Sequence, residues 1–483
     1  MRNEGFVWQL LNRCAETEES TVAFSLYDGS QITNITYRHF REDIRKSTGY
    51  FIHKNIKGQH IAIAAENSYD WLVVFFGITG SGNVAVLLNQ DLPTDVLRQQ
   101  SEQADVSIIC GNASRTPDIK KLPSTAFLDF EEICAGQAIA MDMQHCTDSE
   151  DTMAMMFTSG TTGKSKIVAF SNRNFQASME NAESDLRAPT ICRMLLTFPL
   201  YHISGLVATT TYLQLSKTVC IGRGMRYVLA DISKLNPTFI PMVPSVLGSI
   251  VKLLNGAKTE EQRRRILGNN LTSIAIGGSS TEQSLSRYIM DLGISIETAY
   301  GMTETAGATT RCVWNKDNIG SIGKPYGTTQ CRIENGELLL KGPSIMKGYY
   351  KDPEATAAII QDGWLHTGDL AYCDENGYYY LTGRKKNVII LANGENVNPE
   401  EIEEKLSECP DILESLVYSD GKKICADIYT NDGLAAADFV RRYNDNVPLY
   451  RQIHNVNYTS TPLEKTGSGK IKRKEAAHES QGN

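Results

Sequence analysis

The chain has 483 residues, of which 41% are hydrophobic and 22% charged, and its formal net charge is -8. This length predicts several domains or subdomains, the composition is typical of a folded globular protein, and the negative charge gives no general attraction to nucleic acid or anionic membranes. Eleven cysteines without a Cys-x-x-Cys pair predict reduced thiols and a cytoplasmic location, and they disfavour a structural zinc site.

The first third of the chain alternates short apolar runs with helical patterns. Apolar runs at residues 61–65, 84–88 and 106–110 alternate with helical patterns at 69–79 and 93–104, which predicts parallel strands joined by crossover helices. The uncharged stretch 71–88 approaches membrane-spanning length, but glycines between residues 77 and 83 interrupt it. It therefore predicts a helix, a turn and a buried strand, and no integral membrane segment.

Residues 158–166 form a loop rich in glycine and hydroxyl groups, TSGTTGKSK. Small residues let the backbone close around a phosphate, and hydroxyls, amides and lysine bind its oxygens. Apolar runs at 153–157 and 167–170 predict two strands joined by this loop. A Walker A motif would need glycine in place of Thr158 and would open a helix, so an ordinary P-loop hydrolase is excluded. Taken alone, the segment is also compatible with a plain surface loop.

The remainder of the chain changes character near residue 330. Apolar runs at 218–221, 239–243 and 271–276 continue the α/β rhythm, whereas turn-separated β segments follow at 337–341, 378–382 and 387–391. A helix is expected at 399–407, because proline and acidic residues favour its start, and a hairpin with an Asp-Gly turn at 416–424. The predicted fold class is α/β, with layered α/β subdomains and a small β subdomain in residues 1–383, and a small α+β domain in residues 384–483.

Four further motifs follow the glycine-rich loop. They are FPLYHISG at 198–205, YGMTET at 300–305, WLHTGDL at 364–370 with Gly383 and Arg384 after it, and KTGSGKI at 465–471. In this order the five motifs resemble the AMP-forming acyl-CoA synthetase, adenylation-domain and luciferase superfamily over nearly the whole chain. The resemblance implies a two-step ligase, in which a carboxylate attacks the α-phosphate of ATP to give an acyl-adenylate and pyrophosphate, and a thiol then attacks the acyl carbon.

The resemblance also implies nucleotide-binding roles. The β- and γ-phosphates would be held by Thr158, Ser159, Gly160, Thr161, Thr162, Gly163 and Lys164. Thr303 would touch the α-phosphate, and Glu304 would hold Mg²⁺, which prefers oxygen ligands. Adenine would lie beside Gly277, Gly278, Ser279, Tyr300 and Gly301. Without the flanking motif, Glu304 could be an exposed acid at a helix start.

Two residues late in the chain would complete the adenylation site. Asp369 would accept hydrogen bonds from both ribose hydroxyls with Arg384 nearby, and Lys470 would bridge the carboxylate and the α-phosphate. Lys386 would be the hinge on which the small domain swings. The local alternatives are a turn-capping role for Asp369, a solvated basic tail for Lys470 and an ordinary surface position for Lys386.

The second motif bears on the substrate. Relatives that activate amino acids carry Asp where this chain has His202. In this position the chain instead resembles acyl- and aryl-CoA ligases, in which a histidine borders the acyl pocket. The segment NVIILANGEN at 387–396 is similar to fatty acyl-CoA ligases, so fatty and aromatic acids both stay open. The leading hypothesis is an ATP- and Mg²⁺-dependent ligase with CoA as acceptor. The alternatives are an enzyme that loads an acyl carrier protein and an inactive nucleotide-binding regulator, which the presence of Glu304, Asp369 and Lys470 disfavours.

Two features depart from the family pattern. The phosphate loop commonly continues as Lys-Pro-Lys-Gly, whereas this chain has Ile167 in the glycine position. A β-branched residue adopts a positive φ only at a cost, so extended backbone is expected there. The small domain is also expected to be shortened around residues 420–423. The sequence therefore does not determine which surface binds the thiol acceptor.

Overall fold

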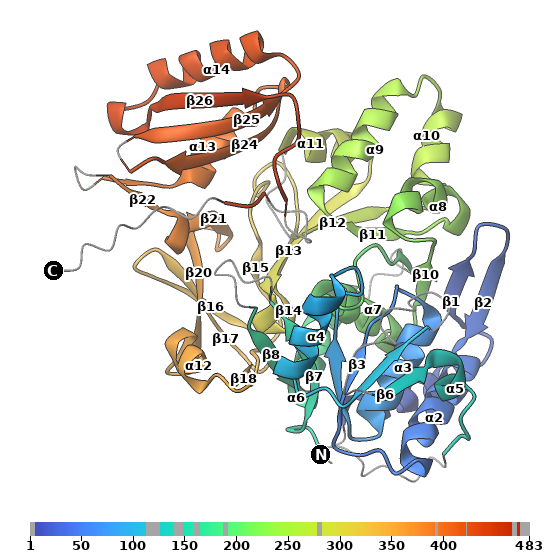
Figure 1. Cartoon of the computed structure of the whole chain (residues 1–483). Coiled ribbons are helices and arrows are strands. Elements are labelled where there is room, and N and C mark those ends of the chain that lie inside the picture. The colour runs from blue at the N-terminus through green and yellow to red at the C-terminus, as the bar shows by residue number, and fades with distance from the viewer. Residues whose placement is uncertain are drawn as a thin grey trace.

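The computed structural model describes residues 5–112, 126–139, 148–158, 165–186, 192–277, 283–391, 395–421, 423–465 and 471–473. Two large sheets with helices around them form the body (Figure 1), and a smaller β-sheet adjoins them. A further unit built from the C-terminal part of the chain stands at the upper left of the view. This mixed α/β architecture confirms the predicted fold class.

The first large sheet is mainly parallel. Its strand order is β18 (Gly348–Tyr349), β8 (Ile167–Ser171), β7 (Thr152–Phe157), β4 (Val84–Leu87), β3 (His60–Ile63), β5 (Ile108–Gly111), β6 (Ala126–Asp129). The strands from β7 to β6 run parallel, whereas β8 and β18 are antiparallel additions. Intervening helices are α3 (Tyr69–Gly80), α4 (Thr94–Gln103) and α5 (Phe130–Cys134). The predicted strand-helix alternation is thus confirmed.

The second large sheet has nine strands. Their order is β15 (Lys324–Pro325), β14 (Gly307–Val313), β13 (Ser295–Met302), β12 (Ser273–Ile276), β11 (Phe239–Met242), β9 (Arg193–Leu195), β10 (Thr218–Ile221), β1 (Val22–Tyr27), β2 (Ile32–Thr36). The strands from β13 to β1 are parallel. Between β9 and β13 along the chain lie the helices α7 (Ile203–Gln214), α8 (Val228–Leu235), α9 (Pro244–Gly256), α10 (Glu260–Leu267) and α11 (Gln283–Asp291).

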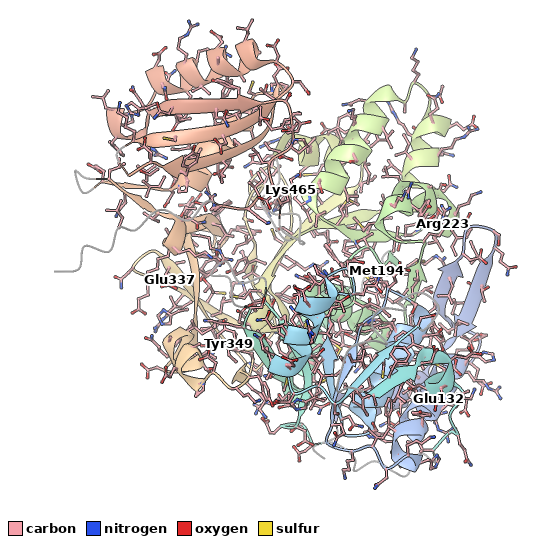
Figure 2. All side chains as sticks on the ribbon, viewed as in Figure 1. Glu132, Met194, Arg223, Glu337, Tyr349 and Lys465 are labelled. Carbon is pink, nitrogen blue, oxygen red and sulfur yellow. The ribbon has the colours of Figure 1, made fainter. Side chains whose placement is uncertain are left out.

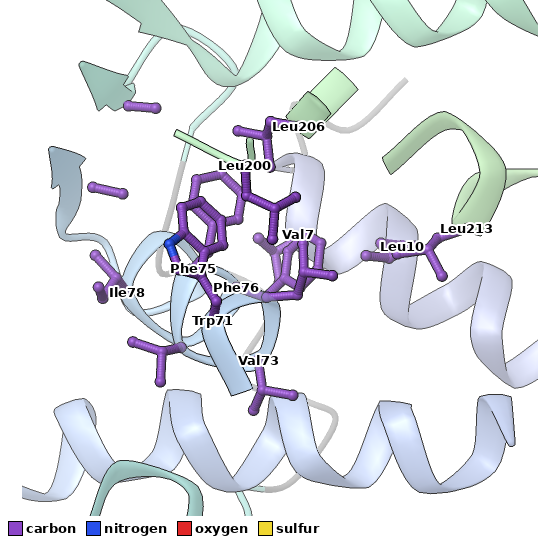
Figure 3. Packing of buried hydrophobic residues seen from close by; sticks show 14 of the residues in the cluster. Val7, Leu10, Trp71, Val73, Phe75, Phe76, Ile78, Leu200, Leu206 and Leu213 are labelled. Atoms are coloured by element: carbon purple, nitrogen blue, oxygen red, sulfur yellow. The ribbon is translucent and has the colours of Figure 1, made fainter. Parts of the chain in front are cut away.

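The largest hydrophobic cluster joins the two large sheets. It combines strand residues of both with residues of α1 (Phe6–Glu16), α2 (Tyr37–His53), α3, α6 (Asn172–Leu186) and α7. Every residue of α3 from Trp71 to Gly80 is buried, and Figure 3 shows Trp71, Phe75 and Phe76 of this helix packed among apolar side chains. A helix that is apolar on all sides belongs in a protein interior, which explains the uncharged stretch. Across the described ranges, no helix has the length and apolar character needed to cross a membrane.

The smaller sheet contains β16 (Gln330–Glu334), β17 (Glu337–Lys341), β20 (Trp364–Cys373), β19 (Ile360–Gln361) and β21 (Tyr379–Arg384), and α12 (Pro353–Ile359) precedes β19. After β21 the strand expected at 387–391 is shorter than predicted. Residues Lys385–Asn387 form a 3₁₀ turn (η4), and β22 covers only Ile389–Ile390. Among the described residues, that strand pairs only with β23 (Asn396–Val397), so few ladder bonds support it.

The C-terminal unit has a hydrophobic cluster of its own. It contains α13 (Pro399–Leu406), β24 (Ile412–Ser419), β25 (Ile424–Thr430), α14 (Gly433–Asp445) and β26 (Ile453–Thr459). The helix that begins at Pro399 and the β24–β25 hairpin agree with the sequence expectations. The division of the chain at residue 384 stays a prediction.

Close packing of α3 against α2 gives a stability prediction. A Cβ on Gly77 would lie 2.9 Å from the backbone carbonyl carbon of Ser47 and closer still to its hydroxyl. Gly77→Ala is therefore expected to lower the free energy of unfolding by about 2 kcal/mol, because backbone atoms must move. The midpoint of urea unfolding measures this change.

Gly248→Ala in α9 is the matched control. The nearest atom to a Cβ there is Leu285 Cδ1 at 3.8 Å, so the substitution is expected to stabilise the protein by about 0.5 kcal/mol through helix propensity. Equal shifts for the two variants would contradict the packing argument.

Candidate active site

A buried carboxylate lies where β13, β20 and β21 meet. Asp369 is 4% exposed and pairs in register with Arg384, whose Nε is 2.5 Å from Asp369 Oδ1. The Tyr300 hydroxyl donates to Asp369 Oδ2 at 2.5 Å. Burial, and then the Asp369 charge, raise the pKa of Tyr300 well above its ordinary value, so the phenol stays protonated and remains a donor. The three predicted residues therefore form one hydrogen-bonded group around an acceptor suited to paired hydroxyls.

Glu304 forms a second polar group just beyond the end of β13. It belongs to the 3₁₀ turn Thr303–Thr305 (η3) and is 7% exposed, so the alternative of an exposed acid is wrong. The hydroxyl of Tyr349, labelled in Figure 2, donates to Glu304 Oε1 at 2.8 Å. The ammonium of Lys166, at the end of the phosphate loop, lies 4.6 Å from the centre of the Tyr349 ring. A buried carboxylate on a fixed turn fits a hard divalent cation.

The turn that carries Thr303 and Glu304 is held by its own hydrogen bonds. The Thr305 hydroxyl accepts from Met302 N at 3.0 Å and donates to Gly307 O at 2.5 Å. A Cβ on Gly301 would lie 2.9 Å from Ala308 Cα, so the approach of β14 to β13 requires glycine at this position. The geometry explains why this predicted nucleotide-site residue has no side chain.

The phosphate loop is described at its two ends. Thr158 N donates to Lys166 O at 2.9 Å, and Phe157 pairs with Ile167, which confirms a strand-loop-strand arrangement. Ile167 is buried and is the first residue of β8. Its backbone is therefore extended, as predicted. The predicted phosphate ligands Ser159, Gly160, Thr161, Thr162, Gly163 and Lys164 lie outside the described residues.

The adenine segment follows β12. Gly277 directly succeeds Ile276, the last residue of that strand, and its backbone N–H donates to Met242 O at 3.3 Å. The predicted neighbours Gly278 and Ser279 lie outside the described residues.

The histidine of the second motif occupies the N-cap of α7. His202 Nδ1 accepts from Ser204 N at 3.3 Å, and its side chain is exposed. Asn67 accepts from Leu200 N and donates to Phe198 O, both at 2.8 Å, and so fixes the segment before His202. Sequence reasoning missed Asn67, because it lies more than a hundred positions from this segment and no local pattern marks it.

Hydrogen bonds connect the predicted hinge with the end of the chain. Lys386 lies in η4, and the adjacent Asn387 donates to Glu400 Oε1 at 2.6 Å. Arg473 is 3.2 Å from the same Glu400 oxygen and 2.6 Å from Glu403 Oε2. The hinge turn and the segment that follows KTGSGKI are thus both attached to α13.

The two end residues of the KTGSGKI motif pair with each other, and the first of them contacts the C-terminal unit. Lys465 and Ile471 pair as an antiparallel bridge, and Lys465 Nζ is 2.5 Å from Glu414 Oε1. Lys470 itself lies outside the described residues, so its role stays a prediction.

Comparison with known proteins identifies the class. The family model described as AMP-binding enzyme matches residues 11–350, and the chain belongs to this family. A 2-succinylbenzoate–CoA ligase of Bacillus cytotoxicus is 32% identical over 379 residues, which cover 74% of this chain and 75% of that protein. A Bacillus cereus protein of the same name is 31% identical over 400 residues, or 79% of each chain.

Solved structures agree with the sequence relatives. O-succinylbenzoate coenzyme A synthetase from Bacillus subtilis in complex with AMP has a TM-score of 0.83 and 25% identity, covering 96% of this chain and 97% of that one. The same enzyme has been solved with ATP and magnesium and with its acyl-adenylate. An anthranilate CoA ligase with anthranoyl-AMP, at 18% identity and a TM-score of 0.86 over 98% of this chain and 96% of its own, shares the fold.

These findings establish the activity class predicted from the motifs. The chain is an AMP-forming acyl-CoA ligase, which uses ATP and Mg²⁺ to convert a carboxylic acid to an acyl-adenylate and then transfers the acyl group to CoA. The predicted family, activity, cofactors and acceptor are confirmed. The roles of individual site residues stay predictions.

Proposed function

We propose that the carboxylic acid is 2-succinylbenzoate, an aromatic acid with a second carboxylate on a succinyl side chain. The observation that carries this proposal is the agreement of relatives at 30 to 32% identity, all named 2-succinylbenzoate–CoA ligase and matched over 74 to 79% of this chain. The B. subtilis enzyme in complex with its acyl-adenylate intermediate OSB-AMP matches over 96% of this chain. His202, exposed at the start of α7, is the proposed border of the acyl pocket.

In the proposed site, Asp369 binds the ribose hydroxyls with Arg384 and Tyr300 as its fixed partners. The short contacts among these three residues support this role. Glu304 holds Mg²⁺ and Thr303 contacts the α-phosphate, which is supported by their shared turn and by the burial of Glu304. Residues 158–164 hold the β- and γ-phosphates, Gly277 to Ser279 and Gly301 border the base, Lys470 is the adenylation lysine and Lys386 the hinge.

A second thiol partner and the location complete the proposal. Besides CoA, an acyl carrier protein is the further acceptor to be tested. We place the enzyme in the cytoplasm, because the ten cysteines in the described part of the chain are free thiols and a reducing compartment keeps thiols in that state.

The test is a substrate panel. The protein is incubated with ATP, Mg²⁺ and either 2-succinylbenzoate, benzoate, anthranilate or octanoate, and with CoA, a phosphopantetheinylated carrier protein or no thiol. Adenylates and thioesters are quantified by mass spectrometry. We expect kcat/KM for 2-succinylbenzoate to exceed that for benzoate by about a hundredfold, because benzoate lacks the second carboxylate and would leave the groups that bind it in the proposed site unpaired.

One result would overturn the substrate assignment. A higher kcat/KM for octanoate or for a simple benzoate would reject 2-succinylbenzoate as the substrate. Thioester on CoA but not on the carrier protein would reject the carrier protein as a partner.

A further inference from the structure

Glu337 is a buried carboxylate that lies beside the Asp369 group but belongs to none of the five motifs. It begins β17 and is 5% exposed. In the ladder, Glu337 pairs with Leu370 of β20, and the register shifts directly after this pair. Leu370 follows Asp369, so Glu337 lies at the irregularity where the strand presents the ribose carboxylate.

One oxygen of Glu337 fixes the backbone before Asp369. Glu337 Oε1 accepts from Gly368 N at 2.9 Å, and Gly368 has a φ of 71°, a conformation that favours glycine. Thr367 completes this local structure, because its hydroxyl donates to Leu338 O at 2.7 Å and accepts from Asp369 N at 3.0 Å. The position of Asp369 thus depends on contacts with the first residues of β17.

The other oxygen of Glu337 reaches the residue after Arg384. Lys385 Nζ donates to Glu337 Oε2 at 2.9 Å, and His366 Nδ1 lies 3.6 Å from the same oxygen. Burial acts to raise the pKa of Glu337, but the bonds from Lys385 and Gly368 N outweigh it and lower that pKa. The carboxylate therefore stays charged, and its bond to the ammonium is charge-assisted.

We propose that Glu337 is a positioning residue for ribose recognition, because its carboxylate joins the turn before Asp369 to the lysine after Arg384. In the antiparallel ladder of β20 and β21, Gly368 and Lys385 directly adjoin the Asp369–Arg384 pair at one end, so Glu337 holds both strands beside that pair. Glu337 acts on the nucleotide only through that pair. The inference rests on the proposed binding of the ribose hydroxyls by Asp369.

Glu337→Gln is the sharpest variant, since it keeps the shape of the side chain and removes its charge. The amide oxygen can still accept from Gly368 N, but the NH₂ group then faces the Lys385 ammonium, and two donors cannot bond to each other. The attachment at Lys385 is lost, and Arg384 is less well fixed. The contacts between Asp369 and the ribose hydroxyls should weaken, whereas contacts with adenine and phosphate should not.

The readout is the preference of the full-length protein for AMP over 2′,3′-dideoxy-AMP, measured by titration calorimetry. The wild-type protein should prefer AMP by about 10- to 100-fold, the value of hydrogen bonds to a charged group. Glu337→Gln should reduce this ratio by about tenfold, as loss of a partner that orients a binding residue does elsewhere. A general loss of stability would change both dissociation constants and leave their ratio intact.

Asp231→Asn supplies the matched control. Asp231 is 1% exposed and, like Glu337, bonds to both a backbone N–H and a cation, here Arg223 N at 2.7 Å and Arg223 Nη2 at 2.6 Å. Figure 2 shows Arg223 on the opposite side of the molecule from Glu337. The control should leave the ratio unchanged.

Lys385→Met removes the second attachment from a side chain that is 66% exposed, so it keeps the test valid if Glu337→Gln fails to fold. It should reduce the AMP preference by about threefold, the value of a partly exposed ionic hydrogen bond. An unchanged ratio in Glu337→Gln or Lys385→Met, or an equal decrease in Asp231→Asn, would overturn the positioning role of Glu337. It would leave the ribose role of Asp369 intact. A wild-type protein without preference for AMP would overturn the ribose role of Asp369 and this inference with it.

Discussion

Lys470→Ala is expected to lower the rate of acyl-adenylate formation by at least about a hundredfold, the loss seen when one preorganised donor to a developing charge is removed. The family resemblance assigns Lys470 to the carboxylate and the α-phosphate, where two anionic groups must approach each other. Removing its positive charge leaves that repulsion unscreened in the first half-reaction. Reaction of a supplied acyl-adenylate with CoA should retain most of its rate. Quenched-flow measurement of adenylate and thioester separates the two steps.

Lys472→Ala is the control for a general effect of charge in this basic segment. Lys472 forms an ion pair with Glu464, and its backbone N–H donates to Glu464 O at 2.8 Å. Its loss should leave both half-reactions nearly unchanged. Equal loss of the two half-reactions in Lys470→Ala, or an equal effect of Lys472→Ala, would reject Lys470 as the adenylation lysine.

Much of the fold could be predicted from local patterns. The stretch 71–88 combines an apolar run with a Ser68 N-cap, whose side chain accepts from Trp71 N, and glycines that end the helix before β4. The two strands around the phosphate loop were predictable for the same reason, since apolar runs flank a segment rich in turn-forming residues. In each case the signal and the structure it specifies lie within the same twenty residues or so.

The contacts within the site could not be predicted in this way. Motif matching found Glu304 and Asp369, but not Tyr349, which donates to Glu304 across 45 positions, or the bond from Tyr300 to Asp369 across 69. The sequence pattern marks Glu337 only as the first residue of a β segment. Tyr300, Tyr349 and Asp369 lie in three different sheets, so their contacts depend on how the sheets pack together. The contacts of Glu337 lie at a register shift within one sheet, which no local pattern specifies.

Contacts within the protein fix the position of the Asp369 carboxylate. Arg384 and Tyr300 both hold this carboxylate. The conformational entropy of these side chains is therefore lost on folding and not on binding. Less of the free energy of the ribose hydrogen bonds is then spent on ordering side chains, so binding of the nucleotide is tighter.

Glu304→Gln is the second substitution with a large expected effect. It keeps the side-chain size and an acceptor for the Tyr349 hydroxyl, but it replaces an anionic oxygen ligand with a neutral amide, which binds Mg²⁺ less well. We expect kcat/KM for adenylation to fall about 100- to 1000-fold and the Mg²⁺ concentration for half-maximal activity to rise. Titration of the pyrophosphate release rate with Mg²⁺ measures both.

Glu297→Gln on β13, the strand that precedes the Glu304 turn, distinguishes a metal role from the loss of any buried carboxylate. Glu297 is 2% exposed and bonds to Arg311 and to the Ser273 hydroxyl, so its neutralisation leaves a buried arginine without its anion and should lower stability. Its Mg²⁺ titration should nevertheless match that of the wild-type protein. If Glu304→Gln loses stability but keeps the wild-type Mg²⁺ dependence, Glu304 supports the turn and does not bind the metal, and the cation must be sought among other oxygen ligands of the site.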